Sequence, residues 1–175
     1  QIRHIQVFMW LLRSRTGKMK FYIVHPVRES TLTQVAEFPP IVMTLAGSDP
    51  SGGAGIQADI LTLASLGCQP LSVITALTVQ DTRGVENSWL MEADEGSDQA
   101  RVLLEDMPVA VFKVGMIGSV ENAAVIAESA ADYPDVPLIL DPVLASGGGD
   151  ELANEELRDA IREMLLPLTT LITPN

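Results

Sequence analysis

The sequence predicts an α/β domain built on a mostly parallel sheet. From residue 39 onward, short apolar runs alternate with longer segments of helical spacing, the pattern of βαβ units with right-handed crossovers. Hydrophobic residues make up 47% of the 175 residues, but aromatic residues only 5%. This composition favours one aliphatic core of the kind that parallel sheets bury. Glycine-rich turns follow several of the apolar runs, where the ligands of such sheets bind.

The apolar runs predict five strands: Ile41–Ala46, Leu71–Val79, Val109–Val114, Leu138–Leu140 and Thr170–Ile172. The spacing between them predicts four helices: Ile56–Leu66, Ser97–Asp106, Val120–Ala131 and Asn154–Leu165. Ser119 stands where an N-cap is expected, and Asn154 with its following glutamates starts the fourth helix. Because no helix follows the last strand, we expect a fragment whose sheet is truncated after about the fifth strand.

Residues 1–38 differ from the rest of the chain. They carry six lysines and arginines against two glutamates and show no clean helical or strand period. We expect a basic N-terminal extension outside the fold, with residues 39–175 forming the N-terminal part of the domain. A targeting peptide is the alternative, because the stretch up to Arg28 is free of acidic residues. Transit peptides are also serine-rich, however, and Ser14 is the only serine in that stretch.

The remainder of the chain is strongly acidic, with 21 aspartates and glutamates against five lysines and arginines. We expect such a body to repel nucleic acid. Excess carboxylate with few lysines is also typical of proteins that work in molar salt, where ions screen self-repulsion. No apolar run reaches the length of a membrane span, so no membrane partner is expected. The single cysteine, Cys68, predicts a buried core residue and a reducing, cytoplasmic compartment.

A glycine-rich turn separates the first expected strand from the first helix. Residues 46–59 read AGSDPSGGAGIQAD, and their four glycines and one proline predict a tight turn whose amides can reach a polar ligand. The turn is not a Walker A loop, because no Lys-Ser/Thr pair follows the glycines. It fits a loose dinucleotide pattern, but the acidic residue expected about 20 positions later is absent. Spacing alone leaves a substrate-binding loop and a purely structural turn open.

Three later residues stand at the same expected edge of the sheet. The Gln80 amide offers a donor beside an acceptor, which matches an aminopyrimidine edge, although a loop glutamine is more often merely solvated. Met116 can form an adaptable apolar wall or pack in the core. Asp141 ends a hydrophobic strand, where it can support a Mg²⁺ hydration shell or cap backbone amides. Lys113, the only lysine after position 20, is expected to balance buried carboxylates.

Together and in this order, the motifs resemble those of the hydroxymethylpyrimidine/phosphomethylpyrimidine kinases of thiamine biosynthesis, in the ribokinase-like superfamily. The resemblance extends from Pro39 to Asn175 and rests on five segments: 46–59, that around Gln80, 113–116, 141–145 and 171–175. It implies a ribokinase-like three-layer αβα sandwich. It also implies that ATP and Mg²⁺ are used to phosphorylate 4-amino-5-hydroxymethyl-2-methylpyrimidine and then its monophosphate.

The resemblance implies roles for individual residues. Gln80 would pair with the aminopyrimidine, the small-molecule partner. The rest of the substrate pocket would be formed by five residues: Gly47, Asp49, Ala54, Met116 and Val143. Asp141 and Asn175 would lie on the ATP and Mg²⁺ side, with Asn175 opening an Asn-x-x-Glu motif. Catalytic residues are expected beyond Asn175, so we expect the 175-residue chain to carry the substrate-binding half and to be inactive alone. A homodimer is one assembly compatible with this family.

Two other functions stay open at this point. A vitamin kinase acting on pyridoxal could use the same fold and glycine turn, although Gln80 favours an aminopyrimidine. A non-catalytic pyrimidine-binding module could use the same pocket without transferring phosphate. A dinucleotide-binding oxidoreductase is disfavoured, because the acidic residue that would bind the ribose is absent.

Overall fold

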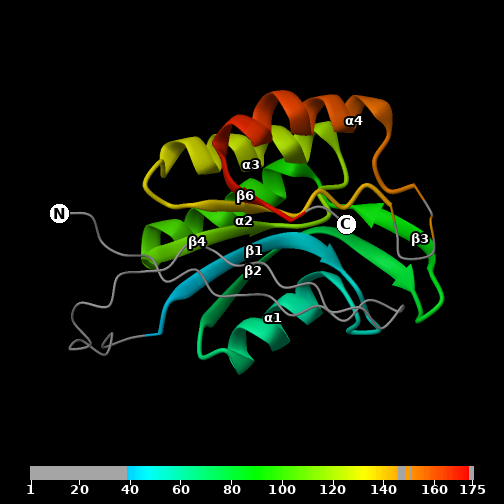
Figure 1. Ribbon diagram of the computed structural model, residues 1–175, viewed down its shortest axis with the longest axis horizontal. Coiled ribbons are helices and arrows are strands. Elements are labelled where there is room, and N and C mark those ends of the chain that lie inside the picture. The colour runs from blue at the N-terminus through cyan, green and yellow to red at the C-terminus, as the bar shows by residue number, and fades with distance from the viewer. Residues whose placement is uncertain (1–38, 146–148, 150, 174–175) are drawn as a thin grey trace. The chain divides into compact units, whose positions relative to one another are not determined.

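Within the described part of the chain, six strands form one sheet in the order β3-β2-β1-β4-β5-β6 (Figure 1). The computed structural model describes residues 39–145, 149 and 151–173. The strands are β1 (Ile41–Ser48), β2 (Gln69–Gln80), β3 (Val85–Leu90), β4 (Val109–Val114), β5 (Leu138–Leu140) and β6 (Thr169–Ile172). β3 runs antiparallel to β2, and every other neighbouring pair is parallel.

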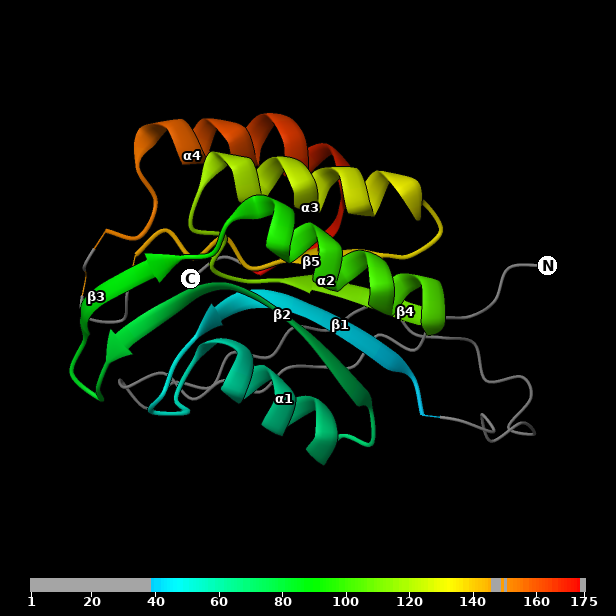
Figure 2. The ribbon, with the colours of Figure 1, turned by 180° about the vertical axis from the view of Figure 1, so that it is seen from behind.

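Helices cover both faces of this sheet. They are α1 (Gly55–Ser65), α2 (Ala93–Asp106), α3 (Val120–Asp132) and α4 (Glu155–Ala160), which continues through a π-helical turn (η1, Ile161–Leu165) and a 3₁₀ turn (η2, Leu166–Leu168). Figures 1 and 2 show α1 on one face and α2, α3 and α4 on the other. The predicted three-layer αβα sandwich is therefore confirmed.

The main core lies between the sheet and the layer of α2, α3 and α4. Its fully buried side chains include Met43, Val73, Val114, Leu138, Leu140 and Leu165. The residues of β1 from 42 to 47 are all buried, because a central parallel strand is covered on both faces. Phe112 and Tyr133 add an edge-to-face contact, with ring centroids 6.5 Å apart.

All five predicted strands are present, and two of them, Val109–Val114 and Leu138–Leu140, match residue for residue. β3 was not predicted, because its residues are largely exposed and its apolar residues do not alternate with polar ones. A turn places it: the Asp81 carboxylate accepts hydrogen bonds from the amides of Arg83 at 2.7 Å and Gly84 at 3.2 Å. The sheet is therefore one strand wider than expected.

The four predicted helices are also present. The Ser119 hydroxyl accepts a hydrogen bond from the Asn122 amide at 3.1 Å, and the Asn154 side chain accepts one from Leu157 at 2.9 Å, so both N-terminal predictions are confirmed. The single helix expected over 154–165 is wrong in detail, because its second half widens into the π-helical turn η1. Residues 1–38 and Asn175 lie outside the described residues.

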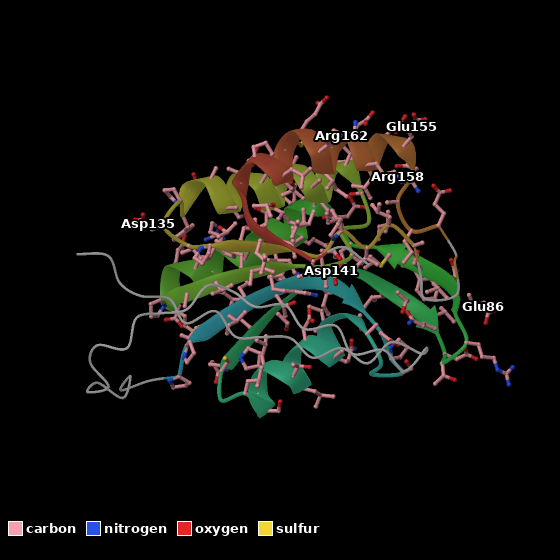
Figure 3. The ribbon with its side chains drawn as sticks, in the orientation of Figure 1. Glu86, Asp135, Asp141, Glu155, Arg158 and Arg162 are labelled. Carbon is pink, nitrogen blue, oxygen red and sulfur yellow. The ribbon has the colours of Figure 1, made fainter. Side chains whose placement is uncertain are left out.

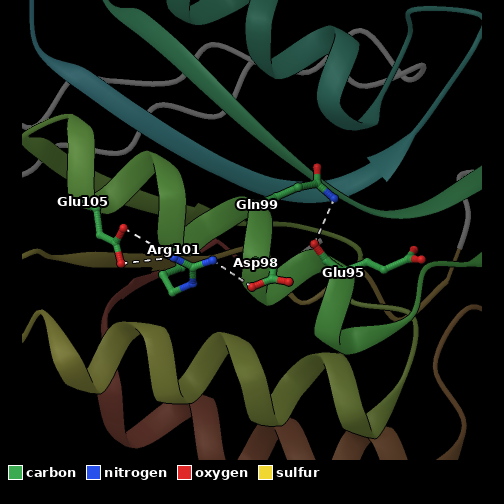
Figure 4. A network of polar contacts seen from close by, with 5 residues as sticks. All are labelled: Glu95, Asp98, Gln99, Arg101 and Glu105. Atoms are coloured by element: carbon green, nitrogen blue, oxygen red, sulfur yellow. Dashed lines mark hydrogen bonds and ion pairs between the residues drawn. The ribbon is translucent and has the colours of Figure 1, made fainter.

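The outer surface of α2 carries an exposed network of charges. Arg101 lies between Asp98 at 3.1 Å and Glu105 at 3.2 Å, while the Gln99 side chain donates to the Glu95 carbonyl (Figure 4). Such exposed pairs contribute little to stability. None of the described helices is both long and apolar enough to cross a membrane.

Candidate functional site

The carboxyl ends of the parallel strands meet at one edge of the sheet, and the predicted site segments lie there. The glycine turn follows β1, the turn at 115–119 follows β4, and the segment beginning at Asp141 follows β5. Backbone hydrogen bonds continue past the strands, from the Gly115 amide to the Leu45 carbonyl and from the Asp141 amide to the Val114 carbonyl. Ligands of open α/β sheets bind at such an edge.

Asp49 organises the glycine turn from within. Asp49 is 3% exposed, and its carboxylate accepts hydrogen bonds from the amides of Ser51 and Ala54, each at 2.8 Å. The Asp49 amide in turn donates to the Gln57 side chain at 2.8 Å. The carboxylate thereby holds the turn in one shape. The predicted contact of Asp49 with the substrate stays a prediction.

Two glycines of the turn allow a close approach of backbone and side chains. Gly55 has φ +59°, and a Cβ there would lie 2.2 Å from the Gly47 carbonyl oxygen, so no other residue fits without a shift. A Cβ on Gly47 would lie 3.0 Å from the Met116 sulfur. The structure thus brings Met116 against Gly47, although these residues come from different turns.

The Met116 turn is held by hydrogen bonds from two other elements. The Thr75 hydroxyl of β2 donates to the Met116 carbonyl. Asn122 of α3 is 2% exposed, and its amide nitrogen lies within 3.2–3.4 Å of the carbonyl oxygens of Thr75, Met91 and Ile117. Sequence reasoning missed both residues, because a threonine in a strand or an asparagine in the first turn of a helix does not reveal distant partners.

Gln80 lies half-buried at the end of β2, after an irregularity in the β2–β3 register between Val79 and Gln80. Such irregularities redirect side chains. The hydroxyl of Thr78 lies 2.8 Å from the Ser48 carbonyl oxygen and 3.2 Å from Gln80 Oε1. Thr78 therefore connects the Gln80 segment to the glycine turn, a link that sequence reasoning also missed.

A buried ion pair lies beneath this edge, on the α1 side of the sheet. Lys113 Nζ is 2.9 Å from Asp59 Oδ2, and the Thr44 hydroxyl donates to the same oxygen. This confirms the prediction that Lys113 balances a buried carboxylate. Asp59 itself was not predicted, but Ile56, Asp59 and Leu63 share the i, i+3, i+7 spacing that marks the buried face of a helix.

Asp141 follows β5, and in Figure 3 it lies within the outline of the fold, unlike Arg162, which projects outward. Its Oδ1 is buried with no hydrogen-bond partner in the part of the chain that the structure describes. Burial raises the pKa of this carboxyl; Lys113 opposes the rise and Asp59 adds to it. Because Oδ1 accepts no hydrogen bond from a described residue, this oxygen does not support the alternative in which Asp141 caps backbone amides.

An unpartnered carboxylate oxygen fits a Mg²⁺ ion, which usually takes one or two protein carboxylates and keeps waters and phosphate oxygens as its other ligands. Among the described residues, no three His, Cys, Asp or Glu side chains are grouped so as to hold a metal by themselves. The half-buried Val143 follows Asp141, and its amide donates to the Asp141 carbonyl at 2.8 Å. Asn175 lies outside the described residues.

Comparison with known proteins shows which proteins the chain is similar to. A hydroxymethylpyrimidine/phosphomethylpyrimidine kinase of Streptomyces coelicolor is 42% identical over 137 residues, which cover 78% of this chain and 51% of that protein. The crystal structure of a phosphomethylpyrimidine kinase from Clostridium difficile 630 has a TM-score of 0.73 at 39% identity and matches 78% of this chain and 59% of that one. The pyridoxal kinase of Staphylococcus aureus in complex with AMP-PCP and pyridoxal has a TM-score of 0.67 at 29% identity, covering 78% and 48%.

These likenesses confirm the predicted ribokinase-like architecture. The chain spans about half or less of the length of the curated relatives it matches. The phosphomethylpyrimidine kinase family matches this sequence over residues 49–175, from the glycine turn onward. This match covers most of the chain, and the chain therefore belongs to the phosphomethylpyrimidine kinase family.

Proposed function

We propose that the protein phosphorylates the hydroxymethyl group of 4-amino-5-hydroxymethyl-2-methylpyrimidine and then its monophosphate, and that this chain carries the acceptor-binding half. One observation supports the proposal: Gln80, linked through Thr78 to the Ser48 carbonyl, and the contact between Gly47 and Met116 lie at the carboxyl ends of the neighbouring strands β2 and β1. The membership of this chain in the phosphomethylpyrimidine kinase family supports the same function.

The residues of this edge divide the task of binding between them. The Gln80 amide would pair with the ring nitrogen and amino group of the pyrimidine, because it offers one donor and one acceptor side by side. Gly47, Ala54, Met116 and Val143 would enclose the ring. Phosphoryl transfer depends largely on holding acceptor and donor in line, and a rigid pocket for the acceptor supplies that alignment.

ATP and Mg²⁺ are the proposed cosubstrates. Asp141 would hold Mg²⁺ through its unpartnered Oδ1; when bound, the ion neutralises charge on the phosphate oxygens. The S. aureus pyridoxal kinase, a structural relative, was solved with a nucleotide analogue. The predicted role of Asn175 in this half of the reaction also stays a proposal. The acidic charge of residues 39–175 and the lone Cys68 support a small-molecule partner and a reducing, cytoplasmic compartment.

Calorimetric titration and product analysis test the proposal together. We expect this chain to bind the aminopyrimidine at least about tenfold more tightly than pyridoxal, because Gln80 would lose its matched edge with pyridoxal. Gln80→Leu should remove that preference. Protein expressed from the complete reading frame, given Mg-ATP, should form the pyrimidine mono- and diphosphates, read as product masses. Pyridoxal phosphate as the main product would favour the other vitamin kinase, and binding without any product would favour a binding module.

A further inference from the structure

We propose that Arg83 binds the phosphate of the monophosphorylated pyrimidine, and that this half of the protein recognises its second acceptor through that contact. The inference rests on the proposed function, in which one pocket takes first the hydroxymethyl compound (4-amino-5-hydroxymethyl-2-methylpyrimidine) and then its monophosphate. Arg83 lies on the turn between β2 and β3, three residues after Gln80.

The two acceptors differ mainly in charge. A phosphate monoester carries about −1.5 to −2 charges at pH 7, whereas the hydroxymethyl group carries none. Residues 39–175 have 21 acidic side chains against five basic ones, so their electrostatic field repels such an anion. A positive side chain close to the phosphate would offset this repulsion.

Arg83 can supply that charge without breaking an ion pair. In the described part of the chain, it is the basic residue without an ion pair, and its side chain is exposed. The neighbouring Asp81 carboxylate accepts hydrogen bonds from backbone amides of the turn instead. The four other basic residues are each paired with a carboxylate: Arg101, Lys113, Arg158 and Arg162.

The turn that carries Arg83 is compact and begins directly after Gln80. The Asp81 amide donates to the Gly84 carbonyl at 3.2 Å, and the Asp81 carboxylate accepts from the Arg83 amide at 2.7 Å. Because consecutive Cα atoms are about 3.8 Å apart, the Cα atoms of Gln80 and Arg83 are separated by at most about 11 Å. A long and flexible arginine side chain can therefore extend to a ligand that Gln80 holds.

The structure of the ligand places the phosphate on the Gln80 side of the ring. In the proposed function, Gln80 pairs with the 4-amino group, and the phosphate is attached through the substituent on the neighbouring ring carbon, position 5. A guanidinium can donate two parallel hydrogen bonds to a phosphate, and such charge-assisted bonds are roughly twice as strong as neutral ones. The hydroxymethyl compound offers no anion, so Arg83 would add affinity for the monophosphate alone.

Calorimetric titration of the full chain with the hydroxymethyl compound and, separately, with its monophosphate tests the inference. Arg83→Gln should weaken binding of the monophosphate about tenfold, because a charge-assisted pair is lost, and binding of the hydroxymethyl compound by less than about twofold. Arg83→Lys keeps the charge but not the planar fork, and should recover part of the loss. The loss should shrink between about 0.1 M and about 1 M KCl, because salt screens an exposed contact.

Arg101→Gln is the matched control. It makes the same change in net charge on the outer surface of α2, where Arg101 pairs with Asp98 and Glu105. Because salt screens distant exposed charges, it should change the affinity for either ligand by less than about twofold. Circular dichroism checks that each variant is folded.

Three results would overturn the inference. If Arg83→Gln weakens the monophosphate no more than Arg101→Gln does, or weakens both pyrimidines alike, the inference fails while the proposed function stands. If wild type binds the hydroxymethyl compound but not the monophosphate, the inference also fails. If wild type binds neither pyrimidine, the proposed function fails, and the inference with it.

Discussion

Lys113 of β4 and Asp59 of α1 form an ion pair 2.9 Å long, in which their side chains are only 13% and 7% exposed. The pair joins the sheet to the helix that follows the glycine turn. Breaking a buried pair by removing one partner is costly, because the other charge stays buried without compensation.

Lys113→Met should therefore lower the free energy of unfolding by about 3–5 kcal/mol, measured by urea denaturation. The double variant Lys113→Met/Asp59→Asn should recover much of this loss, because neither charge is left alone. Arg101→Met is the control: it removes the exposed pairs with Asp98 and Glu105 and should cost less than about 1 kcal/mol. A loss for Lys113→Met no larger than that of the control would contradict the assignment.

Asp141 should make stability depend on pH. Because burial raises the pKa of its carboxyl, the folded chain holds this proton to higher pH than the unfolded chain does. Stability then falls as pH rises from the unfolded pKa of about 3.9 through the raised folded pKa. Asp141→Asn lacks this loss, so its free energy of unfolding should exceed that of wild type by more at pH 7.5 than at pH 4. Urea denaturation of both proteins at the two pH values measures this difference in the free energy of unfolding. A difference that shrinks toward pH 7.5 would contradict the raised pKa.

Gly55 should tolerate no side chain. Gly55→Ala combines a positive φ with a Cβ that would lie 2.2 Å from the Gly47 carbonyl oxygen, so the turn must move. Gly67→Ala is a matched control, because Gly67 has φ +77° but nothing within 4 Å of the added Cβ. The control should cost about 1–2 kcal/mol, the strain of the left-handed region, and Gly55→Ala should cost clearly more. Thermal unfolding compares them, and equal losses would show that the turn adapts freely.

The parallel part of the fold could be predicted because its strands are continuous apolar runs. Val109–Val114 and Leu138–Leu140 were located to the residue, since these short and mostly apolar runs stand out from the polar segments around them. β3 (Val85–Leu90) could not be, because its residues are largely exposed and its place depends on pairing with β2.

The candidate site likewise contains residues that could be predicted from the sequence and residues that could not. Gln80 and Met116 were predicted as site residues from their chemistry and from the order of the motifs, and their contact with a substrate stays a prediction. Thr78 and Asn122 were not predicted, because their partners Ser48 and Thr75 lie 30 and 47 residues away in sequence. These residues come together only in the folded sheet, so their spacing in the sequence does not indicate the contacts.

Asn122 should be essential to the Met116 turn. Asn122→Ala removes an amide that faces three carbonyl oxygens and leaves them with fewer partners. We expect a loss of about 2–3 kcal/mol in the free energy of unfolding and weaker binding of the aminopyrimidine. Asn87→Ala is the control, because Asn87 is exposed and accepts a hydrogen bond only from its neighbour Ser88 among the described residues. Loss of stability without any loss of binding would show that Asn122 does not support the pocket.

The acidic surface should make the chain depend on salt. Residues 39–175 carry 21 acidic side chains against five basic ones, so their mutual repulsion opposes folding in dilute buffer. KCl shortens the screening length to about 3 Å at 1 M, and the free energy of unfolding should rise steeply from low salt to that concentration. A variant with Asp106→Asn, Glu128→Gln and Asp132→Asn, which changes exposed acidic residues away from the first turns of α2 and α3, should be more stable at low salt and show a smaller rise. Because exclusion of salt from apolar surface would raise both proteins alike, equal slopes for wild type and variant would contradict repulsion as the cause.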